Sequence, residues 1–337
     1  DGYVGVQTPV NVMKLTNKDQ YVELLNEANV NTTGYTPKNP SDYPTSTDWY
    51  SELMRNAVMH SHAVDISGAN EKTNYSLGAS YFYQEGIMIA KNDYERINVR
   101  GRLDQKVNNW LNVGVNTVMS NYNKQTAKNS AFLQAFVNPP VYPVYDESNT
   151  EAYPEKFGSP QQYGFSNSYG NPYATVYYND DKEKGINLIL SAFAELSFVN
   201  DKLKLKTAYN FDHGSWESKA YTPEHLVGGS QSLSSSRLVR SVYNRQKHIV
   251  DNTITYTDMV DRHYFTVMGG QSVRLENYSP LMATASGIPY YYPAFYISNG
   301  SANGRSVEDN KMGEDNSSVY IPYRYRGVSF FARGTYN

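Results

Sequence analysis

The sequence predicts an all-β chain, an antiparallel portion of a transmembrane β-barrel with long extracellular loops and two short loop helices. Three observations lead to this fold class. Apolar and polar side chains alternate along about ten segments, the connections between these segments are short and long in turn, and aromatic residues gather at both ends of the apolar stretches. Strands that meet lipid on one side and water on the other produce this combination.

The alternation is clearest between residues 73 and 116. From Arg96 to Leu103 every second residue is polar or charged, and the residues between them are apolar or glycine. Successive side chains of a strand point to opposite faces, so one face is apolar and the other is charged. A soluble sandwich would bury the apolar face against a second sheet, whereas an outer-membrane barrel would expose it to lipid. Alternation alone supports both readings equally.

Composition removes several classes of protein. The net charge is −3 and the basic residues are not clustered in long runs, which argues against nucleic-acid binding. The chain has no cysteine, which excludes disulfide scaffolds and thiolate metal sites. No apolar run approaches the roughly 18 residues of a spanning helix, which argues against a helical membrane protein but does not exclude a β-barrel. The chain begins without an initiator methionine and ends inside an alternating pattern, so we expect a fragment.

Two short helices are expected, both in the first long connection. Residues 18–29 form the first, capped by Asn17 or the threonine before it. The second begins after Asp48 or the preceding threonine and ends near residue 56. Residues 35–44 lie between them and contain three prolines, which remove backbone donors and prevent regular structure.

The remaining regular structure is expected to be strands joined by connections of sorted length. Short turns of Asn, Asp and Gly alternate without exception with long connections, and outer-membrane barrels place short turns on the periplasmic side and long loops outside. The expected strands are residues 2–12, 58–68, 73–84, 95–106, 110–121, 186–198, 202–213, 247–257, 263–275 and 326–337, and the expected long connections are 13–57, 85–94, 122–185, 214–246 and 276–325.

Ring placement and charge add to the barrel interpretation. Trp110, Phe198, Tyr256 and Tyr264 flank the short turns, and a second group, including Tyr81 and Tyr209, lies toward the long connections. Burying a face with this density of charge in a dry core would strongly destabilise the fold, whereas such a face is common in a barrel lumen. The expected lumen-lining residues include Arg96, Arg100, Arg102, Asp104, Glu195, Lys204, Lys206 and Arg333.

Several motifs between residues 65 and 114 resemble one family. The run from Asp65 to Tyr75, then Gln84-Glu85-Gly86-Ile87, Tyr94-Glu95-Arg96 and the run from Asp104 to Gly114, are similar to the SusC/RagA family of TonB-dependent outer-membrane transporters of Bacteroidetes. Residues 47–53 and 327–333 resemble the same family more weakly. Strands, turns and spacing match together, which makes the resemblance more specific than a short motif.

The resemblance implies a barrel of about 22 strands around an N-terminal plug. Residues 1–337 would be the N-terminal half of the barrel, with the plug domain and the other strands outside the chain. It further implies a multi-pass protein of the bacterial outer membrane, contacting its lipid, that imports an oligosaccharide or a peptide. A SusD-like surface lipoprotein would act as a lid, and TonB would act through the plug.

Two aromatic segments on proline-stiffened loops are candidates for substrate binding. A stiff backbone lowers the entropy cost of presenting rings to a sugar or a peptide. The alternative, slightly favoured, is that the rings pack loops together or against a lid. The candidate residues are Tyr142, Tyr145, Tyr290, Tyr291, Tyr292 and Tyr296.

No catalytic residues, metal site or cofactor are expected. His60 and His62 could face one side of a strand as metal ligands, but no third ligand is evident. The acidic runs at residues 180–183 and 309–316 could bind Ca²⁺, but neither has EF-hand spacing, so solvated loops are favoured. No nucleophile elbow or phosphate-binding loop is present.

The sequence therefore supports three functions. The favoured one is a non-enzymatic component of an outer-membrane nutrient transporter. The alternative is a soluble β-rich module that binds or degrades carbohydrate through its Tyr-rich loops. An adhesin-like barrel without a transport role is a weaker third.

Overall fold

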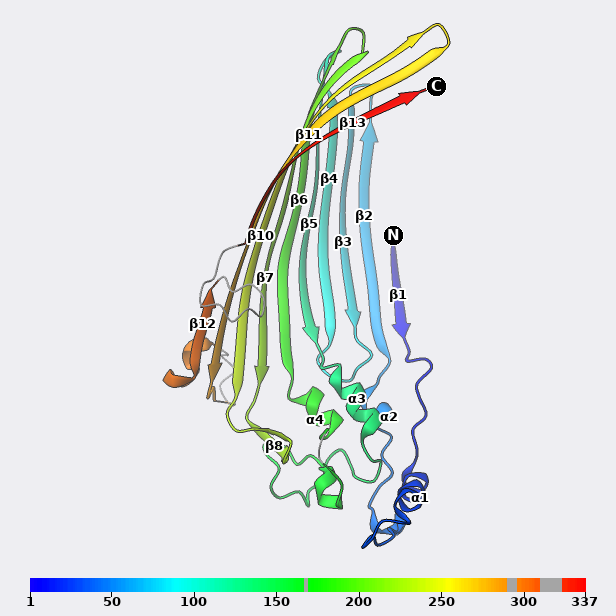
Figure 1. The fold of residues 1–337 in the computed structure, drawn as a ribbon, viewed down its shortest axis with the longest axis vertical. Helices are drawn as coiled ribbons and strands as arrows, with labels where there is room; N and C mark the ends of the chain where they lie inside the picture. The colour runs from blue at the N-terminus through cyan, green and yellow to red at the C-terminus, as the bar shows by residue number, and fades with distance from the viewer. Residues whose placement is uncertain (167–168, 290–295, 310–322) are drawn as a thin grey trace.

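The computed structural model describes residues 1–166, 169–289, 296–309 and 323–337, and its main feature is one open antiparallel sheet (Figure 1). The described part of the sheet has 11 strands that pair in chain order from β1 to β7 and continue through β10 and β11; both β12 and β13 pair with β11. The strands are β1 (Gly2–Gln7), β2 (Ala57–Ala69), β3 (Thr73–Glu85), β4 (Asp93–Lys106), β5 (Leu111–Thr126), β6 (Asp180–Phe198), β7 (Leu203–Thr222), β10 (Arg237–Val260), β11 (His263–Ser286), β12 (Arg305–Asp309) and β13 (Tyr323–Tyr336).

The connections are sorted by length as the sequence predicts. All the short turns lie at one end of the sheet and the long connections at the other (Figure 1). Asx-type side-chain bonds shape two of the turns: the Asn70 side chain accepts from the backbone N–H of Lys72 and Thr73, and Asn108 does the same for Trp110 and Leu111. Local side-chain chemistry therefore fixes these hairpins.

Strand register confirms that the sheet has two chemically different faces. Directly paired residues share a face, and the pairings Leu77↔Gly101, Val99↔Met119 and Val115↔Ala192 connect the aliphatic positions of neighbouring strands. We call this the aliphatic face and the opposite one the charged face. Tyr264 is an exception to the expected aromatic belt, because its pairing with Met259 places it on the charged face, while Phe265 contacts Tyr256 on the aliphatic face.

Several strands are longer than predicted, and the largest extensions are toward the long connections. Strand β6 begins at Asp180 instead of residue 186, β7 continues to Thr222, β10 begins at Arg237, and β11 continues to Ser286. These extensions carry polar residues on both faces, so period-two hydrophobicity does not reveal them. Strand β1 is shorter than predicted and ends at Gln7, because Pro9 has no N–H with which to continue the ladder.

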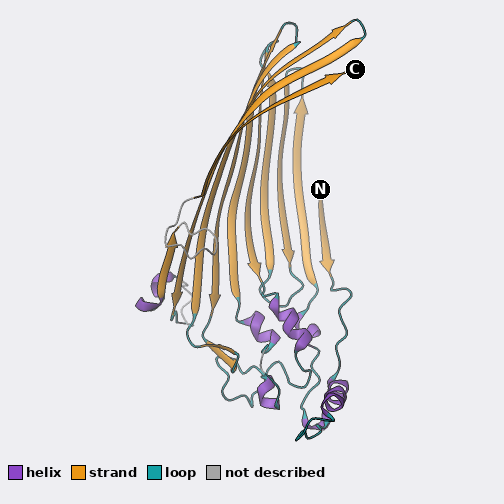
Figure 2. Ribbon diagram, viewed as in Figure 1, coloured by secondary structure: helices purple, strands orange, loops and turns teal. Residues whose placement is uncertain are grey.

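The long connections fold into a layer at their end of the sheet, where the helices gather (Figure 2). We call residues 8–56, 86–92, 127–179 and 223–236, as far as they are described, the loop layer. Helix α1 (Lys18–Asn29) is confirmed, and Asn17 caps it in a capping box with Gln20. Helix α2 (Trp49–Leu53) is capped by Asp48 as predicted but ends earlier, because Met54 becomes extended and bridges to Met88.

Further elements of the long connections were not predicted. Short 3₁₀ turns cover Pro40–Asp42 and Pro160–Tyr163, and two more, Ile297–Asn299 and Ala302–Gly304, follow β11. None of the helices in the described part of the chain has the length and hydropathy needed to cross a membrane. The other unpredicted elements are strand β12, helices α3 (Ser130–Val137) and α4 (Pro172–Tyr177), and the hairpin of β8 (His225–Gly228) and β9 (Gln231–Leu233).

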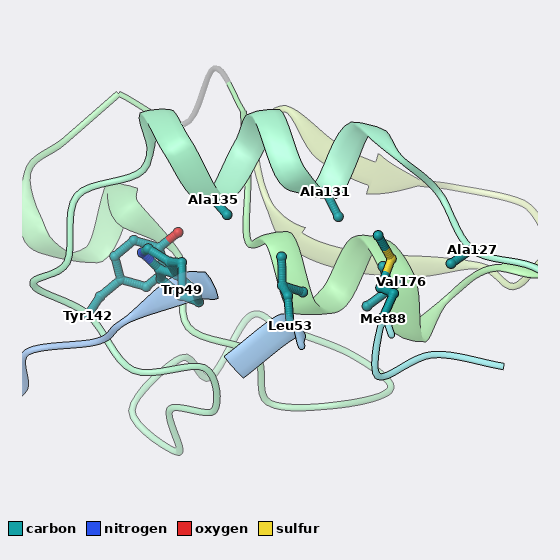
Figure 3. Close-up of a cluster of buried hydrophobic side chains, with 8 residues drawn as sticks. All are labelled: Trp49, Leu53, Met88, Ala127, Ala131, Ala135, Tyr142 and Val176. Atoms are coloured by element: carbon teal, nitrogen blue, oxygen red, sulfur yellow. The ribbon is translucent and has the colours of Figure 1, made fainter. Parts of the chain in front are cut away.

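The loop layer has its own hydrophobic core between α2, α3 and α4 (Figure 3). Trp49 and Leu53 of α2 are fully buried there. Trp49 Nε1 donates to the Pro139 carbonyl oxygen at 3.1 Å, and the Thr47 hydroxyl donates to the Tyr142 carbonyl oxygen at 2.6 Å. Two connections separated by about 90 residues of chain are thereby joined. The other buried members are Met88, Ala127, Ala131, Ala135, Tyr142 and Val176.

Candidate functional site

The charged face of the sheet collects all of the residues expected to line a lumen. The pairings Glu195↔Lys206 and Met268↔Arg333 extend the face that carries Arg100 on β4 to the strands further along the sheet. Several of its charges form ion pairs, so much of the face is neutralised locally. The pairs are Arg100–Asp65 at 2.6 Å, Arg102–Asp104 at 2.7 Å, Lys204–Glu195 at 3.5 Å, Arg245–Asp212 at 3.3 Å, and Arg274–Glu276.

A row of aromatic side chains crosses the same face nearer the long connections. One continuous register runs from β3 to β10 and carries aromatic residues on four of those six strands. Arg96 and Gly185 occupy the other two strands of this register. We call the four rings and their nearest aromatic neighbours on the face the aromatic row: Phe82, Tyr94, Tyr122, Trp216, Tyr243 and Tyr278.

The rings of the aromatic row contact one another in two groups of three, one formed by Phe82, Tyr94 and Tyr122 and the other by Trp216, Tyr243 and Tyr278. Trp216 and Tyr243 stack with centroids 5.2 Å apart and an interplanar angle of 20°, and Tyr243 stacks on Tyr278 at 6.1 Å. Gly185 makes room for the row, because a Cβ there would lie 2.6 Å from the Tyr122 ring. Cross-strand aromatic pairs of this kind stabilise sheets by about 0.2–1 kcal/mol each. All six rings keep part of their surface exposed.

The register next to the aromatic row, toward the short turns, is polar and neutral from β3 to β6. The Ser120 hydroxyl donates to Asn98 Oδ1 at 2.6 Å, and Asn98 Nδ2 donates to Ser80 Oγ at 3.1 Å. Asn187 continues this register on β6. We call these four residues the Ser–Asn row. Aromatic rings therefore lie next to hydroxyls and amides on the charged face.

The predicted loop rings have different positions. Tyr142 is 0% exposed and packs against Trp49 with centroids 4.8 Å apart, so it has the loop-packing role that the sequence allowed as the alternative. Tyr145 is 48% exposed, with one face stacked on Phe157 at 4.8 Å. Of the two, Tyr145 alone offers ring surface to solvent.

The second predicted aromatic segment is described only at its end. Tyr290, Tyr291 and Tyr292 lie outside the described residues. Tyr296 is 56% exposed and lines a hollow of about 510 Å³ with Arg240 and other residues that mostly belong to the aliphatic-face register. The structure therefore places Tyr296 apart from the aromatic row.

Titratable groups in the loop layer are shifted by burial and hydrogen bonding. Burial would raise the pKa of Asp146, but bonds from Ser148 and Tyr163 outweigh it and lower that pKa. Burial and the bond to Asp146 raise the pKa of the Tyr163 phenol. Burial lowers the pKa of His225, which stacks on Tyr178 at 4.4 Å, although a hydrogen bond to the Pro223 carbonyl partly opposes this. These groups hold the layer together.

The candidate metal-binding histidines and the first acidic run lie in strands of the sheet. His60 lies on the aliphatic face among His62, Tyr81 and Tyr83, with ring centroids 5.3 to 5.6 Å away. The acidic run at residues 180–183 was wrongly expected to be a loop; it begins β6, so its side chains alternate between the two faces. Most of the run at residues 309–316 lies outside the described residues. No group of three potential metal ligands occurs among the residues described.

The aromatic row is the part of the site that sequence reasoning missed. Tyr122, Trp216, Tyr243 and Tyr278 all fall in segments that the sequence assigned to long connections. The available signal was weak, since each of the six strands contributes a single ring to the row. Strand pairing, which sequence periodicity does not supply, aligns them.

The fold and faces together define a class of structure. An open antiparallel sheet with one aliphatic and one charged face, hairpin turns at one end and long connections at the other, has the architecture of outer-membrane barrel strands. No protein-family model matches the chain. Comparisons with individual proteins give a more specific result.

The chain is similar in sequence to a TonB-dependent receptor P3 of Formosa agariphila, with 21% identity over 243 residues. The match covers 68% of this chain and 23% of that protein. Solved structures of the RagAB peptide transporter have the same fold: one gives a TM-score of 0.73 at 17% identity, covering 99% of this chain and 40% of the other. Its open-open state gives 0.74 at 18%, covering 100% and 39%.

These comparisons confirm the resemblance to SusC/RagA-like TonB-dependent transporters. The sequence match links the chain to a TonB-dependent receptor, and the structural matches establish the fold. The chain spans less than half the length of each of these relatives.

Proposed function

We propose that this chain is part of the barrel of an outer-membrane transporter that imports a nutrient with energy delivered through TonB. The observation that carries the proposal is the two-faced sheet with sorted connections. On β6 the aliphatic positions extend from Ile186 to Phe198. That is about 40 Å of strand, or about 28 Å across a membrane at a tilt near 45°, close to the thickness of a hydrocarbon core.

This proposal also gives the other features an orientation relative to the membrane. The short turns face the periplasm, the loop layer faces outward, and the charged face lines the lumen with Arg96, Arg100, Arg102 and their partners. Residues 1–337 form the N-terminal half of the barrel, and a plug and further strands complete it. An open edge cannot remain unpaired in lipid, which requires this completion.

The cargo class and partners belong to the same proposal. The cargo is an oligosaccharide or a peptide; the RagAB relative is a peptide transporter. A SusD-like surface lipoprotein covers the mouth, and TonB pulls on the plug. The chain performs no chemical reaction. Tyr145 and Tyr296 are exposed ring surfaces at the outer end where cargo or lid can make contact.

Detergent extraction and uptake test this proposal. The full-length protein should leave outer membranes only with detergent, and its electrophoretic mobility should change on heating, because a closed barrel resists unfolding. Deleting the gene or tonB should abolish growth on the same oligosaccharide or peptide source. Co-purification should recover a surface lipoprotein. A full-length protein that is a soluble monomer without detergent would rule the proposal out.

A further inference from the structure

We propose that the aromatic row is a cargo-binding track for an oligosaccharide, with the Ser–Asn row supplying hydrogen bonds to sugar hydroxyls. This inference rests on the proposed function, since the charged face must line a pore for cargo to reach the row. It goes further by naming the residues and the chemical class of cargo.

The aromatic rings are not part of the hydrophobic core. None of the six belongs to a buried cluster of the described residues, whereas the loop-layer rings Trp49 and Tyr142 are fully enclosed. The row lies on the charged face of the sheet, so contact with lipid does not account for the presence of these rings. Partly exposed Tyr and Trp rings combine an apolar surface with a polar tip, which suits a ligand that has both.

The neighbouring chemistry favours a saccharide. A pyranose presents C–H groups on its ring faces and hydroxyls around its edge, so it needs aromatic surface and neutral hydrogen-bonding groups together. The Ser–Asn row supplies hydroxyls and amides one register away from the rings. Arg96 is the single charged side chain in the aromatic register between β3 and β10.

Two observations disfavour a peptide at this place. A peptide commonly binds by adding a strand to a free sheet edge, and strands β2 to β7 and β10 are paired on both sides here. Charged termini and side chains also need counter-charges, while Arg245 and Arg100 are already paired with Asp212 and Asp65, and the Glu183 carboxylate accepts from the Tyr122 hydroxyl at 3.0 Å. The row therefore offers ring stacking and neutral hydrogen bonding more than charge recognition.

Calorimetry on the full-length transporter in detergent tests the inference. The probes are maltohexaose, laminarihexaose, xylohexaose and mannohexaose, and a pool of hexapeptides of mixed sequence. The test variant carries Trp216→Leu and Tyr243→Leu, which keep apolar bulk and remove the stacked rings. We expect at least one neutral hexasaccharide to bind, and its Kd to rise about tenfold or more in this variant.

Two controls separate ring chemistry from folding. Trp216→Phe with Tyr243→Phe retains both rings and should keep Kd within about threefold of the unsubstituted protein. Tyr209→Ala with Tyr256→Ala removes one ring from each of the same two strands on the aliphatic face, and should leave binding unchanged. Heat-shifted electrophoresis verifies folding of each variant; if the double Leu variant fails it, Tyr243→Leu alone is measured, with a smaller expected loss.

The outcomes are decisive in either direction. Equal hexasaccharide affinity in the Leu variant, absence of binding to all four saccharides, or loss of hexapeptide binding instead would each overturn the inference. The proposed function is judged separately, by detergent extraction, heat-shifted mobility and TonB-dependent growth of the unsubstituted protein. A transporter that passes those tests while the Leu variant binds and grows normally would refute only the role of the aromatic row.

Discussion

At the scale of single residues, a buried polar side chain helps to hold the loop layer together. His225 lies in the β8–β9 hairpin with its ring stacked on Tyr178 and hydrogen-bonded to the Pro223 carbonyl. Burial favours the neutral imidazole and therefore lowers the pKa of His225. A buried histidine of this kind links the stability of a loop to pH.

We therefore expect the loop layer around His225 to loosen at acidic pH. The folded-state pKa lies below the ordinary value of 6.5, so the unfolded segment binds more protons and the free energy of unfolding falls as pH drops through that range. Hydrogen exchange of residues 172–179 and 223–236, corrected for intrinsic rates, should be faster at about pH 5.5 than at about pH 7.5. His225→Phe keeps the stack and should remove the difference; an identical pH response in this variant would contradict the assignment.

At the scale of elements, helix α4 shows how one side chain can hold several segments. Asn171 is fully buried, caps α4 by accepting from the N–H groups of Tyr173 and Ala174, and donates to the carbonyls of Val144 and Gly158. Three stretches of one long connection therefore meet at one amide. The short helix depends on this site, because six residues are too few to be stable alone.

Replacing this amide should open the loop layer without unfolding the sheet. Asn171→Ala removes the cap and leaves the Gly158 carbonyl without its side-chain donor, while the Val144 carbonyl keeps the backbone N–H of Gly158. The loss should lower the local unfolding free energy by about 2–4 kcal/mol. Limited proteolysis should then cut between residues 127 and 179 while the strands remain protected. Asn39→Ala, at the exposed cap of the Pro40–Asp42 turn, is the matched control and should cost much less. Equal proteolysis of the two variants would show that the amide is not the anchor.

At the scale of the whole molecule, the opposite character of the two faces determines how the chain meets its surroundings. On β6, Leu190 pairs with Phe211 on the aliphatic face and Ile189 pairs with Asp212 on the charged face. The two positions are adjacent in sequence, in the same strand and similar in size. They differ in the face that they occupy, which makes them a matched pair.

A charge placed at these two positions should have unequal effects. In the proposed barrel, position 190 faces lipid and position 189 faces the lumen. In the full-length protein, Leu190→Arg should therefore destabilise the fold by about 2–4 kcal/mol, whereas Ile189→Arg should cost far less. Urea titration of the protein folded into lipid vesicles measures both. If the ranking were reversed, the faces would be exchanged; if both were equally harmful, the sheet would be buried on both sides as in a soluble sandwich.

The charged face was predictable residue by residue, because it depends on a local rule. Alternation along each strand places Arg96, Arg100 and Arg102 together, and antiparallel pairing extends the face from strand to strand without further information. The capped helices α1 and α2 were predictable for the same reason, since their start signals lie within a few residues of each other. By itself the sequence determined the central parts of ten strands of the sheet, their two faces and the sorting of the connections by length.

The tertiary structure decided what lies beyond the aliphatic band. There the strands carry polar residues on both faces, so the period-two pattern of hydrophobicity is lost, and pairing with neighbouring strands extends β6, β7, β10 and β11. That extension aligns Tyr122, Trp216 and Tyr243 in one row and leaves Tyr142 inside the loop core. Contacts between residues distant in the chain fix which rings are buried and which stay open, and local sequence does not encode those contacts.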